Sequence, residues 1–179
     1  LGTGMTQQLA LLAAFALIGG AIELPFTLYQ TFVIEQRFGF NKTTPALFIL
    51  DLLKGVLVGV CLGIPLIAAI LWLMQEVGSL WWLYAWGVVV FFSLFVTFIA
   101  PTVIAPLFNK FSPLDDAEMR ERVSRLLARC GFKVKSLMVM DGSRRSAHGN
   151  AYFTGFGNTK RIVFFDTLLA RLTPTEVEA

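Results

Sequence analysis

Three long apolar segments dominate the first part of the sequence, and they constrain the fold more than any other feature. A helix needs about 20 mostly apolar residues to cross the hydrocarbon core of a bilayer. Three segments meet this requirement, at about 9–29, 48–74 and 80–104. The composition agrees, because 56% of the residues are hydrophobic and 15% are charged, whereas about a quarter are charged in ordinary soluble domains. The sequence therefore predicts a multi-pass α-helical protein that is integral to a lipid bilayer.

Basic residues predict how these segments are oriented, because loops rich in lysine and arginine remain on the cytoplasmic side. Arg37 and Lys42 lie between the first two spans, whereas the turn between the second and third contains Glu76 and no base. Beyond the third span the chain becomes basic, starting at Lys110. We therefore expect the first loop and the C-terminal region to face the cytoplasm, which for a bacterial protein means location in the inner membrane.

Three charged residues lie inside the predicted spans, namely Glu23, Asp51 and Lys54. A charge near the bilayer centre costs about 2.5–3.5 kcal/mol even on the most permissive insertion scale. Two interpretations remain open. In the first, Asp51 and Lys54 pair along one helix, and Glu23 is hydrated near the interface. In the second, all three line a water-filled chamber that opens to the cytoplasm, and bends at Pro25 and Pro65 accommodate it.

The chain changes from apolar to polar near Asn109. We therefore predict a transmembrane region at 1–108 and a second domain at 109–179. This second domain contains most of the arginines, but no stacking aromatic residues are interleaved with them. Such a pattern is typical of a solvated face near anionic lipid, and we expect no nucleic-acid partner.

The second domain has the pattern of a small α+β fold. Residues 115–129 have the spacing of an amphipathic helix, for which Ser112 or Asp115 is a candidate N-cap. Runs rich in valine, methionine and aromatic residues then predict strands, at 135–140, 150–154 and 161–165. A mixed or antiparallel sheet is expected.

The final residues, TPTEVEA, have the signature of a helix N-terminus. Thr173 suits the N-cap, Pro174 the first helical position, and Glu176 the return contact of a capping box. We therefore expect a helix to begin at this point.

The chain contains one histidine, His148, in a glycine-rich loop before the second predicted strand. Zinc needs three or four ligands, and Cys61 and Cys130 lie far from His148 in the sequence, so no metal site is expected within these residues. A serine hydrolase is disfavoured because the chain has no G-x-S-x-G motif. The remaining interpretation is a surface loop whose histidine is held by backbone groups.

A resemblance to a known family changes this interpretation. Three blocks carry it, in this order along the chain: FVIEQRFGFNKTT (32–44), IAPTVIAPLFNKF (99–111) and DGSRRSAHGNAYFTGFGNTKRIVFFDTLL (141–169). Together they resemble the type-I CAAX prenyl proteases, which are integral-membrane zinc endopeptidases of eukaryotes and bacteria. The resemblance implies a partial zincin-like protease domain on the cytoplasmic side, after the three transmembrane helices.

In that family a helix after the third block carries H-E-x-x-H, whose two histidines bind zinc while the glutamate acts as general base. The resemblance implies that TPTEVEA begins this helix and that the sequence ends before the motif. It therefore implies a zinc cofactor whose ligands lie beyond Ala179, with no catalytic or metal-binding residue in this chain. These residues alone are expected to be inactive.

The resemblance also implies a substrate-binding edge strand, formed by Asn150, Ala151, Tyr152 and Phe153. Such a strand binds the substrate in extended form, backbone to backbone. The Asn150 amide is expected to hydrogen-bond the substrate backbone, and Ala151 to keep the edge uncluttered. Tyr152 and Phe153 are expected to alternate between groove and core. His148 is expected to be a loop residue, or to support the site without binding zinc.

The implied function is the N-terminal part of an integral-membrane zinc metalloendopeptidase that cleaves peptide or protein substrates on the cytoplasmic side. Eukaryotic members of the family cleave prenylated C-terminal CAAX peptides. A second class stays open, a non-catalytic membrane scaffold or a transporter subunit whose intramembrane charges serve a conduction path. An H-E-x-x-H motif in the continuation of the chain would distinguish the two.

Overall fold

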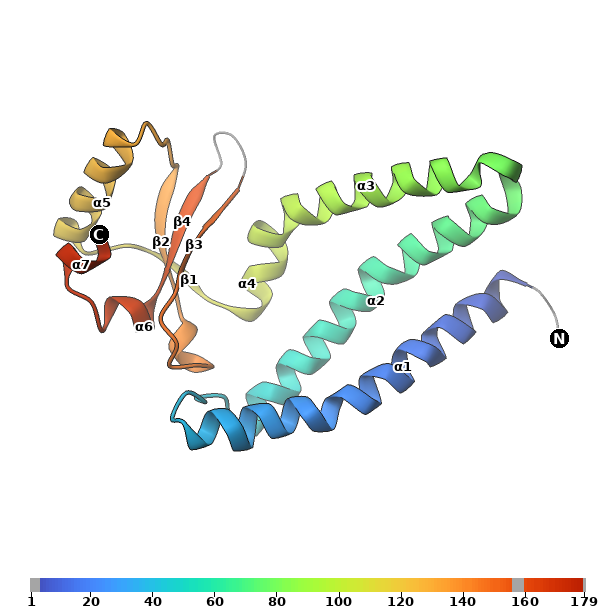
Figure 1. Cartoon of the computed structure of the whole chain (residues 1–179), viewed down its shortest axis with the longest axis horizontal. Helices are drawn as coiled ribbons and strands as arrows, with labels where there is room; N and C mark the ends of the chain where they lie inside the picture. Colours follow the sequence, from blue (N-terminus) through green and yellow to red (C-terminus); the bar gives the residue numbers. More distant parts are fainter. Residues whose placement is uncertain (1–3, 156–159, 179) are drawn as a thin grey trace. The chain divides into compact units, whose positions relative to one another are not determined.

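The computed structural model describes residues 4–155 and 160–178 (Figure 1). The chain forms two compact units. The first, which we call the membrane unit, comprises Leu1–Ile34 and Ala46–Ile99. The second, which we call the sheet unit, comprises Glu35–Pro45 and Ala100–Ala179. The loop between the first two long helices therefore belongs with the C-terminal part of the chain.

Long helices make up the membrane unit: α1 (Met5–Tyr29), α2 (Pro45–Glu76) and α3 (Trp81–Ile99), with the 3-10 helix η2 (Gly78–Leu80) before α3. Within 4–155 and 160–178, three helical stretches are long and apolar enough to cross a membrane. Their large apolar side chains are mostly exposed, as with Phe15 at 78% and Phe91 at 73%. Such exposure is favourable in lipid and unfavourable in water.

Both α1 and α3 continue as π-helices. η1 (Gln30–Glu35) follows α1, whereas η3 (Ala100–Ile104) follows α3 and leads into the short helix α4 (Ala105–Phe108). A π-helical stretch shifts the helix register while it keeps the backbone hydrogen-bonded. This property matters at the end of a membrane span, where little water replaces a lost bond.

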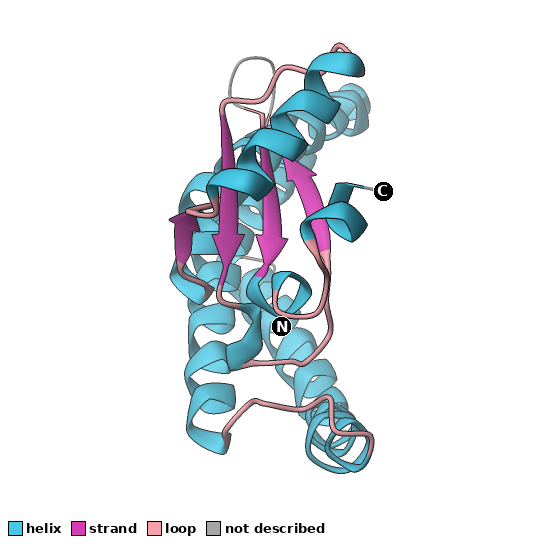
Figure 2. Ribbon diagram, turned by 90° about the vertical axis from the view of Figure 1, so that its left-hand side faces the viewer, coloured by secondary structure: helices cyan, strands magenta, loops and turns pink. Residues whose placement is uncertain are grey.

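The sheet unit is built on a four-stranded mixed sheet, in the order β1-β2-β4-β3. Its strands are β1 (Phe111–Pro113), β2 (Ser136–Met140), β3 (Ala151–Thr154) and β4 (Arg161–Phe165). β2 and β4 are parallel, and the outer strands β1 and β3 run antiparallel to their neighbours. Figure 2 shows the four strands side by side, with α5 crossing one face. The mixed sheet was predicted, but β1 was not.

Helix α5 (Ala117–Arg129) covers this face of the sheet. Its N-cap is Asp116, whose Oδ1 accepts a hydrogen bond from Met119 N–H at 3.0 Å. The expectation of Ser112 or Asp115 as cap was therefore wrong, because the helix starts two residues later than the apolar spacing indicated. At the other end Gly131 has φ +66°, a left-handed conformation that glycine adopts without strain.

The core of the sheet unit lies between α5 and the sheet. Met119, Val123 and Leu127 recur every four residues on one face of α5 and are buried. They form one cluster with Ile162 and Phe164 of β4. Phe164 is 5% exposed, so its whole side chain contributes to packing.

Short helices complete the sheet unit: η4 (Gly142–Arg144), α6 (Asp166–Leu169) and α7 (Pro174–Glu178). The predicted helix start at Thr173 is present, since Thr173 N–H donates to Glu176 Oε2 at 2.7 Å. Thr173 Oγ1 donates to the same oxygen at 2.8 Å, and the two hydrogen bonds from Thr173 lower the pKa of Glu176. The predicted fold class is confirmed, with three candidate membrane helices followed by a small α+β domain. The predicted division at residue 109 stays a prediction.

Candidate functional site

Strand β3 is the outermost strand at one side of the sheet. It pairs with β4, and no strand among the residues described by the structure pairs with its other edge. Of the four residues predicted to bind substrate, Ala151, Tyr152 and Phe153 lie in β3, and Asn150 directly precedes it. Within the part of the chain that the structure describes, this edge of β3 is therefore open, and the binding of substrate by these four residues stays a prediction.

The β3–β4 register determines which backbone groups face this open edge. Phe165 N–H donates to the Asn150 carbonyl at 2.9 Å, so the backbone of Asn150 faces β4. Backbone groups of successive residues alternate between the two edges of an antiparallel strand. Tyr152, opposite Val163, therefore also faces β4, whereas the N–H and C=O of Ala151 and Phe153 face outward.

Side chains of β3 alternate between the two faces of the sheet. Ala151 lies opposite Phe164, and Phe153 opposite Ile162, so both are on the α5 face. Phe153 is 59% exposed, and its ring lies 5.1 Å from that of Phe132. A small apolar pocket on this face is lined by Ala151 and Phe153 together with residues of α5, β4 and α7.

Tyr152 is on the opposite face and is half-buried. Its hydroxyl donates to Met140 Sδ at 3.9 Å, and its ring meets that of Phe165 edge-on, with centroids 6.2 Å apart. Burial raises the pKa of the Tyr152 phenol, and the positive charge of Arg161 partly offsets the shift. Tyr152 is therefore a neutral packing residue at neutral pH.

The Asn150 side chain is turned toward the strand edge. Its Oδ1 accepts a hydrogen bond from Ala151 N–H at 2.8 Å. The amide oxygen thus accepts from Ala151 N–H, which is the first outward-facing donor of β3. This hydrogen bond orients the rest of the carboxamide. Among the described residues, the Nδ2 group of Asn150 has no hydrogen-bond acceptor. It remains able to donate to a carbonyl group that approaches the edge.

His148 lies in the loop before β3 and is exposed. Its ring stacks on that of Phe40, with centroids 4.1 Å apart and planes 19° apart. Its carbonyl accepts a hydrogen bond from Thr167 Oγ1 at 2.7 Å, and its N–H donates to Ser146 Oγ at 3.2 Å. The predicted role of His148 as a supporting loop residue stays a prediction.

Zinc, which the resemblance implies, needs three or four ligands. Within 4–155 and 160–178 there is no group of three or more His, Cys, Asp or Glu side chains that could hold a metal ion. The described residues therefore do not fit a zinc site, and no catalytic step through a metal follows from them.

The three intramembrane charges lie on two helices. Glu23 is exposed on α1, whereas Asp51 and Lys54 are partly buried on α2, and each of these two has an interaction of its own. Both interpretations given for these residues, local pairing and the lining of a chamber, stay predictions.

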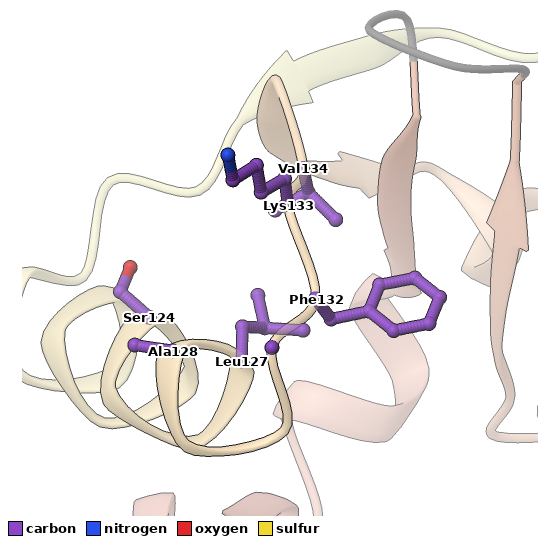
Figure 3. Close-up of a pocket in the computed structure, with 7 residues that line it drawn as sticks. Ser124, Leu127, Ala128, Phe132, Lys133 and Val134 are labelled. Atoms are coloured by element: carbon purple, nitrogen blue, oxygen red, sulfur yellow. The ribbon is translucent and has the colours of Figure 1, made fainter.

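A second hollow lies at the C-terminal end of α5 (Figure 3). Ser124, Leu127, Ala128 and Phe132 line it with the neighbouring residues 131, 133 and 134, and the Phe132 ring points toward the strands. Its one charged lining residue is Lys133. Among the residues that the structure describes, this lining contains no acid–base pair.

Sequence reasoning missed two buried polar residues, Asn41 at 7% and Thr167 at 9% exposure. Both contact the segment before β3, since Asn41 forms a β-bridge with Ser146 and Thr167 binds His148. The signal available was FGFNKTT, in which two phenylalanines flank a glycine and four polar residues follow, but it does not indicate a partner about a hundred residues later.

Comparisons with known proteins identify the class and then the family. A family model described as peptidase family M48 matches residues 113–179, which contain the sheet and its open edge. A second model, described as CAAX prenyl protease N-terminal, five membrane helices, matches residues 1–110. The chain therefore belongs to the CAAX prenyl protease family, as the resemblance predicted. This membership disfavours a membrane scaffold or a transporter subunit.

Individual relatives agree with this assignment. The chain is 48% identical over 163 residues to a CAAX prenyl protease 1 homolog of Oryza sativa subsp. japonica, covering 91% of this chain and 38% of the relative. It is 40% identical over 179 residues to a probable CAAX prenyl protease 1 of Schizosaccharomyces pombe, covering 38% of that protein. The crystal structure of S. mikatae Ste24p is similar with a TM-score of 0.88 and 36% identity, over 95% of this chain and 40% of that chain. The chain thus spans less than half the length of these relatives.

Proposed function

We propose that this chain is the membrane and substrate-strand portion of an integral-membrane zinc metalloendopeptidase. In this proposal the outer edge of β3 binds a peptide or protein substrate as an added strand. The observation that supports it most is the open edge itself, where the backbone groups of Ala151 and Phe153 point outward. Strand addition recognises the main chain, and it therefore tolerates varied side chains.

The edge offers a defined set of hydrogen-bonding groups to a substrate. Ala151 C=O and both backbone groups of Phe153 are available in an antiparallel or parallel pairing. The N–H of Ala151 is taken by Asn150 Oδ1, so the Asn150 Nδ2 group replaces it as the donor at that end of the strand. In the proposal, Asn150 therefore sets where along the strand the substrate chain ends its pairing.

The substrate class is proposed from the relatives, whose names describe CAAX prenyl proteases. A prenylated C-terminal CAAX peptide is accordingly the first substrate to test. Zinc is the proposed cofactor, because M48 peptidases are generally zinc-dependent. Since the chain has one histidine, the zinc ligands are proposed to come from residues outside this sequence. When bound, the metal supplies a Lewis acid and an activated water.

The cytoplasmic orientation of the sheet unit is likewise a proposal, supported by the positions of Arg37, Lys42 and Lys110. With the native Cys61 and Cys130 replaced by serine, Lys42→Cys and Lys110→Cys are expected to react with an impermeant maleimide only after the cytoplasmic face is exposed. Ser79→Cys, in the turn between α2 and α3, is expected to react from the opposite side. Labelling in the reverse pattern would place the peptidase on the wrong side of the membrane.

Asn150→Ala in the whole protein is expected to lower kcat/KM by roughly 3- to 30-fold, with zinc content unchanged. The reason is the loss of one hydrogen bond to the substrate backbone, worth about 0.5–1.5 kcal/mol net and more if the substrate carbonyl stays unpaired. Steady-state kinetics on a prenylated CAAX peptide, with elemental analysis for zinc, measures both.

Two variants sharpen this test. Asn150→Asp keeps the oxygen that accepts from Ala151 N–H and loses the Nδ2 donor, so it is expected to be as impaired as Asn150→Ala. His148→Ala is expected to lower kcat/KM less and to retain zinc. Unchanged kinetics in both Asn150 variants would make Asn150 a structural residue, and loss of zinc in His148→Ala would make His148 a ligand.

A further inference from the structure

The loop that links α1 to α2 is a structured part of the sheet unit. This stretch, which we call the 36–44 loop, follows η1: residues 36 and 37 are still helical, and the helix ends in a turn with Gly39 in the left-handed region, at φ +76°. Gly39 N–H donates to the Gln36 carbonyl at 3.1 Å, and Phe40 N–H donates to the Glu35 carbonyl at 2.8 Å. This is the hydrogen-bond pattern of a Schellman motif. The helix end thus fixes the direction in which the loop leaves it.

The 36–44 loop pairs with the segment that precedes β3. Asn41 and Ser146 form an antiparallel β-bridge. Lys42 N–H donates to the Arg145 carbonyl at 3.0 Å, and Ala147 N–H donates to the Phe40 carbonyl at 2.8 Å. The hydroxyl of Thr43 adds a third bond, also to the Arg145 carbonyl, at 3.0 Å. The loop therefore acts as a one-residue strand beside residues 145–147.

Asn41 holds this loop in its pairing conformation. Its side chain is 7% exposed, and both ends of the amide are hydrogen-bonded. Oδ1 accepts from Thr43 N–H at 2.7 Å, and Nδ2 donates to Gln36 Oε1 at 3.0 Å. A buried amide satisfied at both ends favours one conformation, because any other leaves a polar group unpaired.

The same segment is held from its other side by α6. Thr167 Oγ1 donates to the His148 carbonyl at 2.7 Å. Gly149 lies so close to Leu168 that a Cβ atom at this position would be 3.3 Å from the Leu168 Cα. On the loop side, the His148 ring stacks on Phe40. The residues just before Asn150 are therefore confined between the 36–44 loop and α6.

We infer that the 36–44 loop positions the substrate-binding strand, with Asn41 and Phe40 as positioning residues. The inference rests on the proposed function of β3 as the substrate-binding edge and adds what fixes that edge in place. Asn150 and the outward groups of β3 directly follow the confined segment. If that segment became disordered, Asn150 and the start of β3 would become disordered with it. A strand that must be ordered during binding has a lower apparent affinity, because only the ordered fraction binds.

Phe40→Ala and Asn41→Ala in the whole protein are expected to raise KM for a prenylated CAAX peptide about three- to tenfold, with kcat within about twofold of the wild type. KM distinguishes positioning from folding, since a partly unfolded preparation loses apparent kcat while its folded molecules keep the wild-type KM. Phe40→Tyr retains the aromatic ring that stacks on His148 and is expected to restore the wild-type KM.

Phe38→Ala is the matched control, because Phe38 lies in the same loop and is 67% exposed. It is expected to leave KM and kcat unchanged. A wild-type KM in both Phe40→Ala and Asn41→Ala, with kcat falling in proportion to the folded fraction measured by thermal unfolding, would overturn the inference. Phe40 is less buried than Asn41, so Phe40→Ala is expected to disturb folding less. If Asn41→Ala does not fold, the KM of Phe40→Ala decides the test.

The failure of this inference can be told apart from failure of the proposed function. Phe153→Pro blocks the β3 edge itself and is expected to lower kcat/KM about 100-fold if β3 binds substrate, whatever the loop does. If such a block is effective and the loop variants keep the wild-type KM, the loop inference alone is wrong. If the block has no effect, the proposed role of β3 is wrong, and the loop inference falls with it.

Discussion

Phe153→Pro in the whole protein is expected to lower kcat/KM for a prenylated CAAX peptide by about 100-fold, equivalent to about 2.7 kcal/mol. The N–H of Phe153 faces the open edge of β3, so proline removes one proposed substrate donor and puts its ring in the path of the incoming strand. This N–H makes no hydrogen bond to β4. Proline is tolerated on edge strands at such positions, because the N–H that it lacks is not needed to hold the sheet together. The variant should therefore fold normally.

Phe153→Ala is the matched control, since it removes the same side chain and keeps the N–H. It is expected to lower kcat/KM by less than about fivefold, because only the exposed ring is lost. Equal activities of the proline and alanine variants would mean that substrate does not pair with this edge. Far-ultraviolet circular dichroism and the melting temperature of both variants verify that the sheet is retained.

Phe164→Ala is expected to lower the free energy of unfolding of the sheet unit by about 3–5 kcal/mol. Phe164 is 5% exposed and packs in the cluster that joins β4 to α5. Removing its ring leaves a cavity where β4, the strand beside β3, meets α5. The melting temperature of the detergent-solubilised protein, followed by intrinsic fluorescence, should fall by more than about 10 °C.

The same Phe153→Ala variant provides the comparison for this effect. Phe153 belongs to the neighbouring strand, on the same face of the sheet, but it is 59% exposed. Its loss is expected to cost less than about 1 kcal/mol, mainly through the contact with the Phe132 ring. If both variants melted at the same temperature, the cluster around Phe164 would not be the core that stabilises the sheet.

Much of the fold could be predicted because its signals are local. Membrane helices can be recognised from their length and apolar composition. β2, β3 and β4 can be recognised from runs of β-forming residues between glycines. The cap at Thr173 was predicted from Thr173, Pro174 and Glu176, which lie within four consecutive positions. β1 was missed because its three residues, FSP, include a proline and gain strand character only by pairing with β2.

The parts of the candidate site that could not be predicted depend on contacts between distant residues. Thr43 and Arg145 are 102 positions apart, and nothing in either local sequence indicates the other. The orientation of the Asn150 amide depends likewise on the strand edge, because its partner is a backbone group that β4 leaves free. The run of β-forming residues predicted the strand itself, whereas the buried contacts of Asn41 required the folded chain.

An open strand edge also exposes a protein to self-association, since the edge of one copy is a template for the edge of another. β3 has two features that oppose such aggregation. It is four residues long, Ala151–Thr154, and the Asn150 carboxamide already occupies its first outward N–H. A second copy of this short edge would gain few hydrogen bonds. The same limit applies to a peptide that pairs with this edge. It also gains few hydrogen bonds from β3, so a long lifetime of the complex would require contacts outside β3.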